Sequence, residues 1–485
     1  MAEKVPLPGG EGGSPVCALA AWPPDRAIAA LLSSGTGSPR SRWSVLACPR
    51  QVIECPAAAP DRALDLLRAV CASSDNRRAA DADAPPFIGG WLVVLSYELG
   101  AVFEPTARRR AGQPTGWPLV QLFDCPAAYV HDQATQRWYA VGDSSLLPEL
   151  TFSGQSRPDS VRRFACSRVR SLTGRRRFED SVERAVEYIR AGDVFQANIA
   201  HHLSCGFQGS PRALFGNLVC STSPWYGAYL ESPAQNEAAA SRIIASVSPE
   251  LFLEFEARTR RITTRPIKGT RRAGTGAGAE LLSSEKDAAE LAMIVDLMRN
   301  DLGRVCEFGS IRVDEARAVE AHAARSLFGA VCSGLLHTVG TVSGTVRADR
   351  TLFDLLAGAF PPGSVTGAPK IRAMQIIDEL EPRARGPYCG AIGYISTCGN
   401  AAFSVAIRTA LLHGRYGSPG NFDEFRGRLR FPVGAGIVAD SDPAAEWRET
   451  LHKASSFLRA VRPSCEANVP HAFGHRRLRS SEHAA

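Results

Sequence analysis

One lysine stands in a stretch of chain that could bring it close to a ligand. Residues 264–271 read Thr-Arg-Pro-Ile-Lys-Gly-Thr-Arg and follow short alternating runs within 251–263 that predict strands. Pro266 stiffens the exit from the strand, and Gly269 permits a close backbone approach. If Lys268 is desolvated there, its pKa falls and the free amine becomes a nucleophile. On this octapeptide alone, an exposed lysine in a turn is the better interpretation.

Acidic side chains share one face on each of two predicted helices. They are Asp287 and Glu290 in residues 284–304, and Glu446 and Glu449, with Lys453, in the last helix. Carboxylates from two helices suit a hard cation such as Mg²⁺, whose other ligands would be waters and a substrate carboxylate. For either helix alone, surface pairing such as Glu449 with Lys453 is the simpler interpretation.

Two glycine-rich segments and one arginine could bind carboxylate groups. The segments 363–370 and 433–437 could offer backbone N–H groups as anion nests, although a tight turn is the commoner meaning of such glycines. Arg408 lies in the apolar run 405–409, so a half-buried guanidinium there needs an anionic partner. A substrate carboxylate and a salt bridge within the protein are both open.

Length and composition limit the class of protein. The 485 residues exceed one small core and fit one large domain or two interlocked ones. The net charge of +7 comes mostly from arginine, without the basic stripe that favours nucleic-acid binding. The 13 cysteines are scattered without CxxC pairs or zinc-ligand spacing, which favours reduced thiols. Without a signal sequence or an apolar run of about 18 residues, we expect a cytoplasmic protein that spans no membrane.

The second half of the chain carries the clearer secondary-structure pattern. Apolar residues from Phe178 to Ile189 fall on one helical face, Gly192 ends that helix, and 193–204 alternates like a strand. Ser284 with Asp287 gives a plausible cap for the helix 284–304. The last helix follows Asp442, has Pro443 at its first position and runs to about residue 461.

The first half shows short strand-like runs, separated by turns and by a helix near 63–72. We expect a disordered N-terminus at 1–15, an N-terminal region at 16–143, a linker at 144–176, a catalytic domain at 177–462 and a polar tail at 463–485.

A series of segments, taken in chain order, resembles the chorismate-utilising enzymes. This family includes anthranilate synthase component I, aminodeoxychorismate synthase component I, isochorismate synthase and salicylate synthase. The matching segments are 192–198, 248–250, 266–270, 286–304, 360–371, 386–394, 407–409, 433–437 and 446–453. The resemblance is strong over 178–460 and weaker before. It implies an α+β fold in which two antiparallel sheets face each other and helices lie outside.

The resemblance also implies roles for individual residues. Glu290 and Glu449 would hold Mg²⁺, with Asp287 and Glu446 supporting it through water. Glu250 would be the general acid that helps the C4 hydroxyl of chorismate to leave. The substrate carboxylates and ring would be bound by Gly269, Thr270, Thr366, Tyr388, Arg408, Gly434 and Lys453.

Two positions separate the branches of the family. The branch that adds water has a general-base lysine where this chain has Gln196, so ammonia is the more natural nucleophile. Anthranilate synthases resemble this chain but carry alanine at the position of Lys268, whereas a lysine marks the aminodeoxychorismate synthases. In that branch the lysine attacks C2 as the C4 hydroxyl departs, ammonia adds at C4, and the product is 4-amino-4-deoxychorismate, the precursor of 4-aminobenzoate.

The resemblance further implies a partner and two rival functions. No Gly-x-Cys-x-Gly turn of a glutaminase is present, so ammonia is expected from a separate glutamine amidotransferase subunit. The rivals are anthranilate synthase component I and an inactive chorismate-binding partner of a glutaminase. The latter is motivated by residues 326–329, which stand where relatives have a His-Leu-x-Ser segment close to the ring. Ser33 replaces a glutamate of the tryptophan pocket in anthranilate synthases, so we expect no tryptophan feedback.

Overall fold

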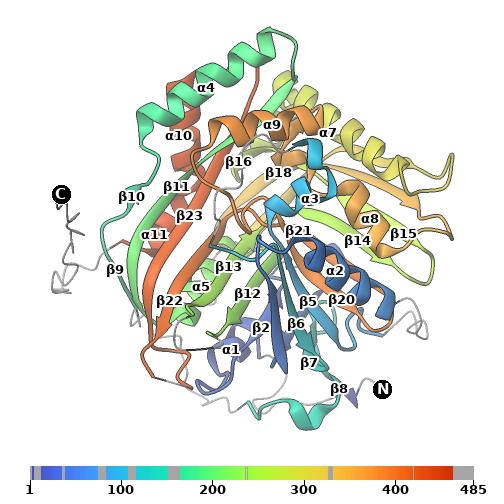
Figure 1. Ribbon diagram of the computed structural model, residues 1–485, viewed down its shortest axis with the longest axis vertical. Coiled ribbons are helices and arrows are strands. Elements are labelled where there is room, and N and C mark those ends of the chain that lie inside the picture. The colour runs from blue at the N-terminus through green and yellow to red at the C-terminus, as the bar shows by residue number, and fades with distance from the viewer. Residues whose placement is uncertain are drawn as a thin grey trace, which may run out of the picture.

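Two antiparallel sheets face each other, and helices lie along their outer surfaces (Figure 1). This is the predicted α+β class, and the prediction is confirmed. The computed structural model describes residues 3–4, 13–34, 39–74, 84–107, 116–150, 164–234, 236, 239–325, 331–418 and 420–462. The predicted tail at 463–485, most of the predicted disordered N-terminus and the segment 326–329 lie outside these residues.

The larger sheet contains β11 (Gln196–Gly209) and β23 (Phe425–Ile437), two of the long strands of the second half. In the described part of the chain its order is β1 (Glu3–Lys4), β8 (Arg137–Gly142), β7 (Ala127–Asp132), β3 (Trp43–Ala47), β2 (Ala29–Leu32), β12 (Tyr226–Ser232), β13 (Ser241–Ser248), β22 (Thr409–Tyr416), β23, β11 and β10 (Arg170–Ser171). Two further short strands, β9 (Phe164–Cys166) and β19 (Gly367–Ala368), also pair with β11.

The second sheet carries the lysine identified above. Its order is β16 (Ile267–Arg272), β18 (Val331–Thr345), β15 (Arg261–Arg265), β14 (Leu251–Glu256), β21 (Ala401–Val405), β20 (Ala391–Ser396), β5 (Gly90–Leu95), β6 (Val120–Cys125) and β4 (Gln51–Cys55). One further strand, β17 (Arg312–Arg325), pairs with β18.

The two halves of the chain share both sheets. Strand β2 of the first half pairs with β12 of the second, and β5 pairs with β20 along its whole length. Apolar side chains from the inner faces of the two sheets, such as Val130 and Leu230 from one and Leu92 and Ile392 from the other, form one buried cluster between them. The core therefore requires strands from both halves of the sequence.

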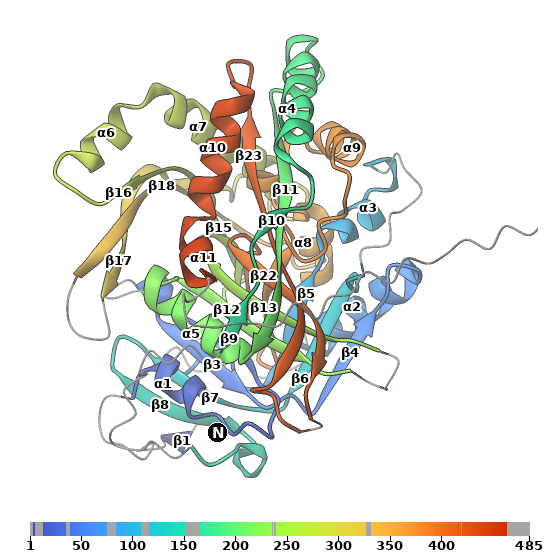
Figure 2. The same cartoon turned by 90° about the vertical axis from the view of Figure 1, so that its left-hand side faces the viewer.

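Helices cover the outer faces of the sheets (Figure 2). They are α1 (Pro15–Ala20), α2 (Pro60–Ser74), α3 (Gly100–Phe103), α4 (Arg175–Arg190), α5 (Pro211–Thr222), α6 (Ala277–Ser283), α7 (Glu285–Gly303), α8 (Leu352–Ala359), α9 (Lys370–Leu380), α10 (Pro443–Lys453) and α11 (Ser455–Ala460). The predicted cap of α7 is confirmed, because the Asp287 N–H donates to Ser284 Oγ at 3.2 Å. None of these helices has the length and apolar character needed to cross a membrane.

The structure corrects three details. Within the predicted linker 144–176, β9 and β10 form, because β11 offers unpaired backbone groups at its edge. At the N-terminus, residues 3–4 pair with β8. The last helix, predicted to run from Pro443 to about residue 461, is two helices, because Ala454 caps the end of α10 and the start of α11.

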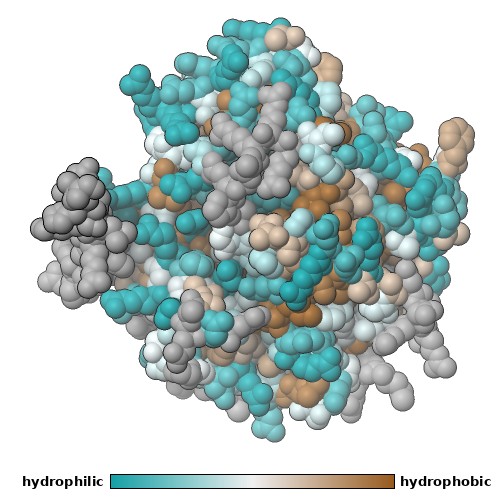
Figure 3. All heavy atoms as spheres, viewed as in Figure 1, coloured by the Kyte–Doolittle hydropathy of each residue, from teal (hydrophilic) through white to brown (hydrophobic). Residues whose placement is uncertain are grey.

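The outer surface is mainly hydrophilic on the face shown in Figure 3, with apolar residues gathered around α2, α3 and α8. There Phe103 of α3 and Phe353 of α8 meet edge to face, with ring centroids 6.0 Å apart. Both rings pack against the buried core and are partly covered by it.

Candidate active site

Lys268 lies on β16 at an irregularity in the strand pairing. The register with β18 shifts between Lys268 and Thr270, and Gly269 between them has φ +74°, a conformation that favours glycine. The predicted turn is therefore a short strand with a bulge. The Lys268 side chain is only 13% exposed, and its Nζ lies 3.7 Å from Glu290 Oε2 on α7. Burial lowers the pKa of Lys268, while the charge of Glu290 opposes this.

The Lys268 amine lies next to Gly436, which has no side chain, and Gln196 lies beside the same glycine. A Cβ added to Gly436 of β23 would lie 3.4 Å from Lys268 Nζ and 2.5 Å from Gln196 Nε2. Gln196 begins β11 and is fully buried, yet both polar atoms of its carboxamide lack a hydrogen-bond partner in the described protein. Buried amide groups normally have partners, so these atoms indicate a position where a ligand is expected.

Glu250 is a buried carboxyl group in the same site. It follows β13 and receives hydrogen bonds from the Ser364 hydroxyl and the Ile267 N–H. Burial raises the pKa of Glu250 to about 7, against the lowering effects of Ser364 and of the Lys268 charge. Glu250 can therefore carry a proton near neutral pH, as a general acid must. Sequence reasoning missed Ser364, although it lies within the glycine-rich segment 363–370.

Arg408 is held in an unusual backbone conformation without a partner. Its φ of 50° lies in the left-handed region, which is strained for a residue with a side chain. Burial lowers the pKa of Arg408 to about 10, and the charge of Glu250 opposes this shift. Among the described residues, its guanidinium group makes neither a hydrogen bond nor a salt bridge. Of the two alternatives left open by the sequence, the salt bridge does not form among the residues that the structure describes, although the charge of Glu250 acts on Arg408.

A histidine stands beside the predicted substrate-binding residue Thr270. The distance from Thr270 Oγ1 to His337 Nδ1 on β18 is 2.8 Å, and His337 packs edge-on against His322 with centroids 4.7 Å apart. Burial lowers the pKa of His337 well below its ordinary value, so the ring is neutral. Residues 326–329, which we placed where relatives have a His-Leu-x-Ser segment, lie outside the described residues, whereas His337 supplies a histidine to this part of the site. The signal in the sequence that could have placed His337 in the site is the strand-like alternation of residues in β18.

The four predicted metal-binding acids divide into two pairs. Asp287 lies against Gly269, and its Oδ2 makes no hydrogen bond within the described residues but lies 3.6 Å from Arg271 Nη2. Glu446 accepts a hydrogen bond from Ser441 at 2.7 Å. Glu290 and Glu449, from α7 and α10, both interact electrostatically with Lys268. Within the described part of the chain, no three His, Cys, Asp or Glu side chains come together as ligands of one ion. A hard cation here would have at most two carboxylates from the protein, with water or substrate completing its shell.

The remaining predicted substrate-binding residues are buried or bound to neighbouring backbone carbonyl groups. Thr366 is fully buried, and its hydroxyl donates to the carbonyl groups of Pro362 and Gly363. Tyr388 is also buried. Lys453 Nζ donates to the Gly434 carbonyl at 3.1 Å and pairs with Glu449 at 2.7 Å.

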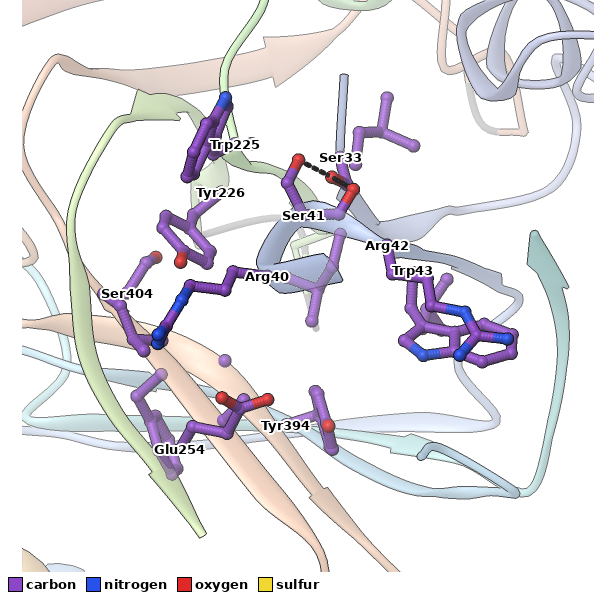
Figure 4. Close-up of a pocket in the computed structure, with 18 of the residues that line it drawn as sticks. Ser33, Arg40, Ser41, Arg42, Trp43, Trp225, Tyr226, Glu254, Tyr394 and Ser404 are labelled. Atoms are coloured by element: carbon purple, nitrogen blue, oxygen red, sulfur yellow. Dashed lines mark hydrogen bonds between the residues drawn. The ribbon is translucent and has the colours of Figure 1, made fainter. Parts of the chain in front are cut away.

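Away from Lys268, a cavity of about 110 Å³ is lined by residues of both halves of the chain (Figure 4). Ser33 lies in its wall, and the Ser33 hydroxyl donates to the Ser41 carbonyl at 2.5 Å. Arg40 extends into the cavity between Tyr226 and Glu254 (Figure 4). The absence of tryptophan feedback stays a prediction.

Comparisons with known proteins place the chain in a family. Residues 31–459 match the chorismate binding enzymes. The chain is 35% identical over 409 residues to anthranilate synthase component 1 of Streptomyces coelicolor, covering 78% of this chain and 74% of that protein. It is 36% identical over 381 residues to aminodeoxychorismate synthase component 1 of Klebsiella aerogenes, covering 77% of each.

A solved structure gives the same family. Anthranilate synthase component I from Streptococcus pneumoniae aligns with a TM-score of 0.67 and 27% identity, covering 87% of this chain and 92% of that one. The family match extends over most of the chain, including Lys268, Glu250 and Arg408. This protein therefore belongs to the chorismate binding enzymes.

Proposed function

We propose that this chorismate-utilising enzyme is component I of an aminodeoxychorismate synthase, which replaces the C4 hydroxyl of chorismate by an amino group. The observation that carries the proposal is the buried Lys268 amine, with its lowered pKa, in the same site as a carboxyl group of raised pKa. Environments that push an amine and an acid toward their neutral forms are what nucleophilic attack with acid assistance requires.

The first step forms a bond between Lys268 and the ring. The Nζ lone pair attacks C2, the ring double bonds shift, and the C4–O bond breaks. Glu250 gives its proton to the departing oxygen, which leaves as water. Glu250 has the required proton near neutral pH because burial raises its pKa to about 7.

The second step releases the lysine. Ammonia attacks C4, the double bonds shift back, and the C2–Nζ bond breaks to give 4-amino-4-deoxychorismate. The Glu250 carboxylate accepts the proton lost by the new C4 nitrogen, which restores the acid for the next turnover. Two displacements of moderate difficulty thus replace one that is harder.

The substrate carboxylates require fixed cations and donors. Arg408 supplies a guanidinium group that makes no salt bridge within the described part of the chain, and such a group suits a carboxylate geometrically and electrostatically. Thr270 and Lys453 supply further donors, while Gly269 and Gly434 let the backbone approach the ring. Thr366 and Tyr388 bound the pocket.

Glu290 and Glu449 would hold Mg²⁺, with Asp287 and Glu446 supporting it through water. The fit rests on two carboxylates, Glu290 and Glu449, that interact with Lys268 from different helices. When bound, the ion neutralises and orients the ring carboxylate of chorismate.

Ammonia would come from a separate glutamine amidotransferase subunit. The relatives from Streptomyces coelicolor and Klebsiella aerogenes are each named component 1, which supports a second component here. The product would supply 4-aminobenzoate for folate or for a secondary metabolite.

Anthranilate synthase component I is the second candidate, favoured by the similar identity of the chain to that enzyme from Streptomyces coelicolor. Incubation of the purified protein with chorismate, Mg²⁺ and ammonium, followed by chromatographic identification of the product, separates the candidates. We expect 4-amino-4-deoxychorismate. Anthranilate would support the second candidate, and chorismate binding without turnover would indicate an inactive partner of a glutaminase.

A further inference from the structure

Arg385 is buried behind the proposed substrate pocket, where it joins three segments of the chain. The Arg385 guanidinium donates to the carbonyl groups of Val365 at 3.0 Å and Asn198 at 2.6 Å. It also pairs with both carboxylate oxygens of Glu381, at 2.9 and 2.5 Å. Val365 directly precedes Thr366, and Arg385 begins the segment that leads to Tyr388. The wall of the pocket is thus fixed around one cation.

The first half of the chain holds this segment from the opposite side. Glu98 Oε1 accepts hydrogen bonds from the backbone N–H of Arg385 at 2.7 Å and of Gly386 at 3.2 Å, and its Oε2 accepts from Gly386 at 3.1 Å. The Tyr97 N–H donates to the Gly386 carbonyl at 2.8 Å. The Arg385 guanidinium lies 4.5 Å from the centroid of the Tyr97 ring.

The backbone between these contacts has little room to move. Gly386 has φ +62°, and a Cβ there would lie 3.3 Å from the ring of the buried Trp117. Two residues on, Tyr388 is 4% exposed. Burial raises the pKa of Glu98 to about 7, against the lowering effect of its backbone N–H donors. The segment is thus held by hydrogen bonds to this carboxyl group on one side and by an indole ring on the other, so a displacement of Glu98 moves Tyr388.

We propose that Glu98 is a positioning residue that sets Tyr388 in the substrate pocket from the other half of the chain. The proposal deepens the proposed function, since it rests on Tyr388 contacting chorismate. It does not depend on which carbon is aminated, because positioning of the ring precedes either reaction. The physical basis is the pair of backbone N–H groups, of Arg385 and Gly386, that donate to Glu98 at 2.7 to 3.2 Å.

The test is the dissociation constant of chorismate, measured by calorimetry with Mg²⁺ and without ammonia. We expect Glu98→Ala to weaken binding at least about fivefold. Glu98→Gln should recover part of this loss, because one amide oxygen can still accept from both N–H groups that Oε1 serves. The matched control is Glu104→Ala, which removes a partly exposed pair with Arg304 at 3.2 Å in the same part of the chain. The control should bind chorismate like the wild type.

A double-mutant cycle separates positioning from general loss of structure. If Glu98 acts through Tyr388, then Tyr388→Phe should weaken binding much less in the Glu98→Ala background than in the wild type. Additive effects of the two changes, or wild-type affinity in a folded Glu98→Ala protein, would overturn the proposal. Thermal unfolding identifies folded variants, and Glu98→Gln gives the same cycle if Glu98→Ala does not fold. Because the readout is affinity and not product, failure here is distinct from failure of the proposed amination.

Discussion

Two arginines, the buried Arg385 behind the proposed substrate pocket and the half-buried Arg408 in it, have opposite surroundings. Arg385 donates to two carbonyl groups and pairs with Glu381. Although burial lowers it, the pKa of Arg385 is held well above its usual range by the charge of Glu381. Arg408 has no such partner among the described residues, and burial lowers its pKa to about 10. Burial alone therefore does not mark a functional residue, whereas burial without a partner does.

The buried carboxyl groups of the same two regions repeat this contrast. Glu381 is bound to Arg385 and also accepts the Ala200 N–H at 2.8 Å, so its charge has full compensation within the protein. Glu250 has weaker compensation, and burial raises its pKa to about 7. The layer behind the pocket fixes the backbone, and the pocket itself retains groups whose protonation can change during a reaction.

The largest expected effect in this comparison is on stability. Arg385→Ala removes one partner of a buried ion pair and leaves Glu381 uncompensated, which typically costs about 3–5 kcal/mol. Urea unfolding should show a loss of this size in the free energy of unfolding. A loss below about 1 kcal/mol would remove the distinction between the two arginines.

Arg408→Gln should affect substrate binding and not stability. Loss of a charged hydrogen bond to a substrate carboxylate corresponds to about 1.5–3 kcal/mol, which is about 10- to 150-fold in affinity. We expect calorimetry to show weaker chorismate binding of this size, with the free energy of unfolding unchanged or increased. Unchanged affinity together with strong destabilisation would instead assign Arg408 a structural role.

An effect confined to one pH interval should appear when Glu250→Gln and the wild type are unfolded at different pH values. The pKa of Glu250 is raised in the folded protein from about 4.5 to about 7, so the folded state binds the proton more tightly. The wild type therefore loses stability from this group as pH rises from 4.5 to 7, and the variant does not. The advantage of Glu250→Gln should grow across that interval, reach at most about 3 kcal/mol, and stay constant above it. An advantage that is independent of pH would contradict the raised pKa.

Local signals in the sequence predicted the parts of the fold that depend on neighbouring residues. The cap of α7 at Ser284 and the start of α10 after Asp442 follow from short-range hydrogen bonds, and both are confirmed. The bend in β16 at Gly269 required a residue that tolerates positive φ. The fold class came from the family resemblance and not from these local signals.

Long-range pairing could not be predicted in the same way. The pairing of β5 with β20 joins segments about 300 residues apart, and the edge strands β9 and β10 have too few residues to show a pattern. The segment 326–329 suggested a missing histidine, whereas His337 stands beside Thr270 because of the register between β16 and β18. The buried contacts of Glu98 with the segment before Tyr388 gave no signal in the sequence.

The most direct test of the account is the formation of 4-amino-4-deoxychorismate by Lys268→Ala, with chorismate, Mg²⁺ and ammonium at saturating concentrations. The matched control is Lys286→Ala, a mostly exposed lysine 4.0 Å from the same Glu290. If the neutral amine of Lys268 bonds to the ring, its removal abolishes most C4 amination, with any residual product shifted toward C2, and the control retains wild-type rates. Full C4 amination by Lys268→Ala would contradict the covalent route.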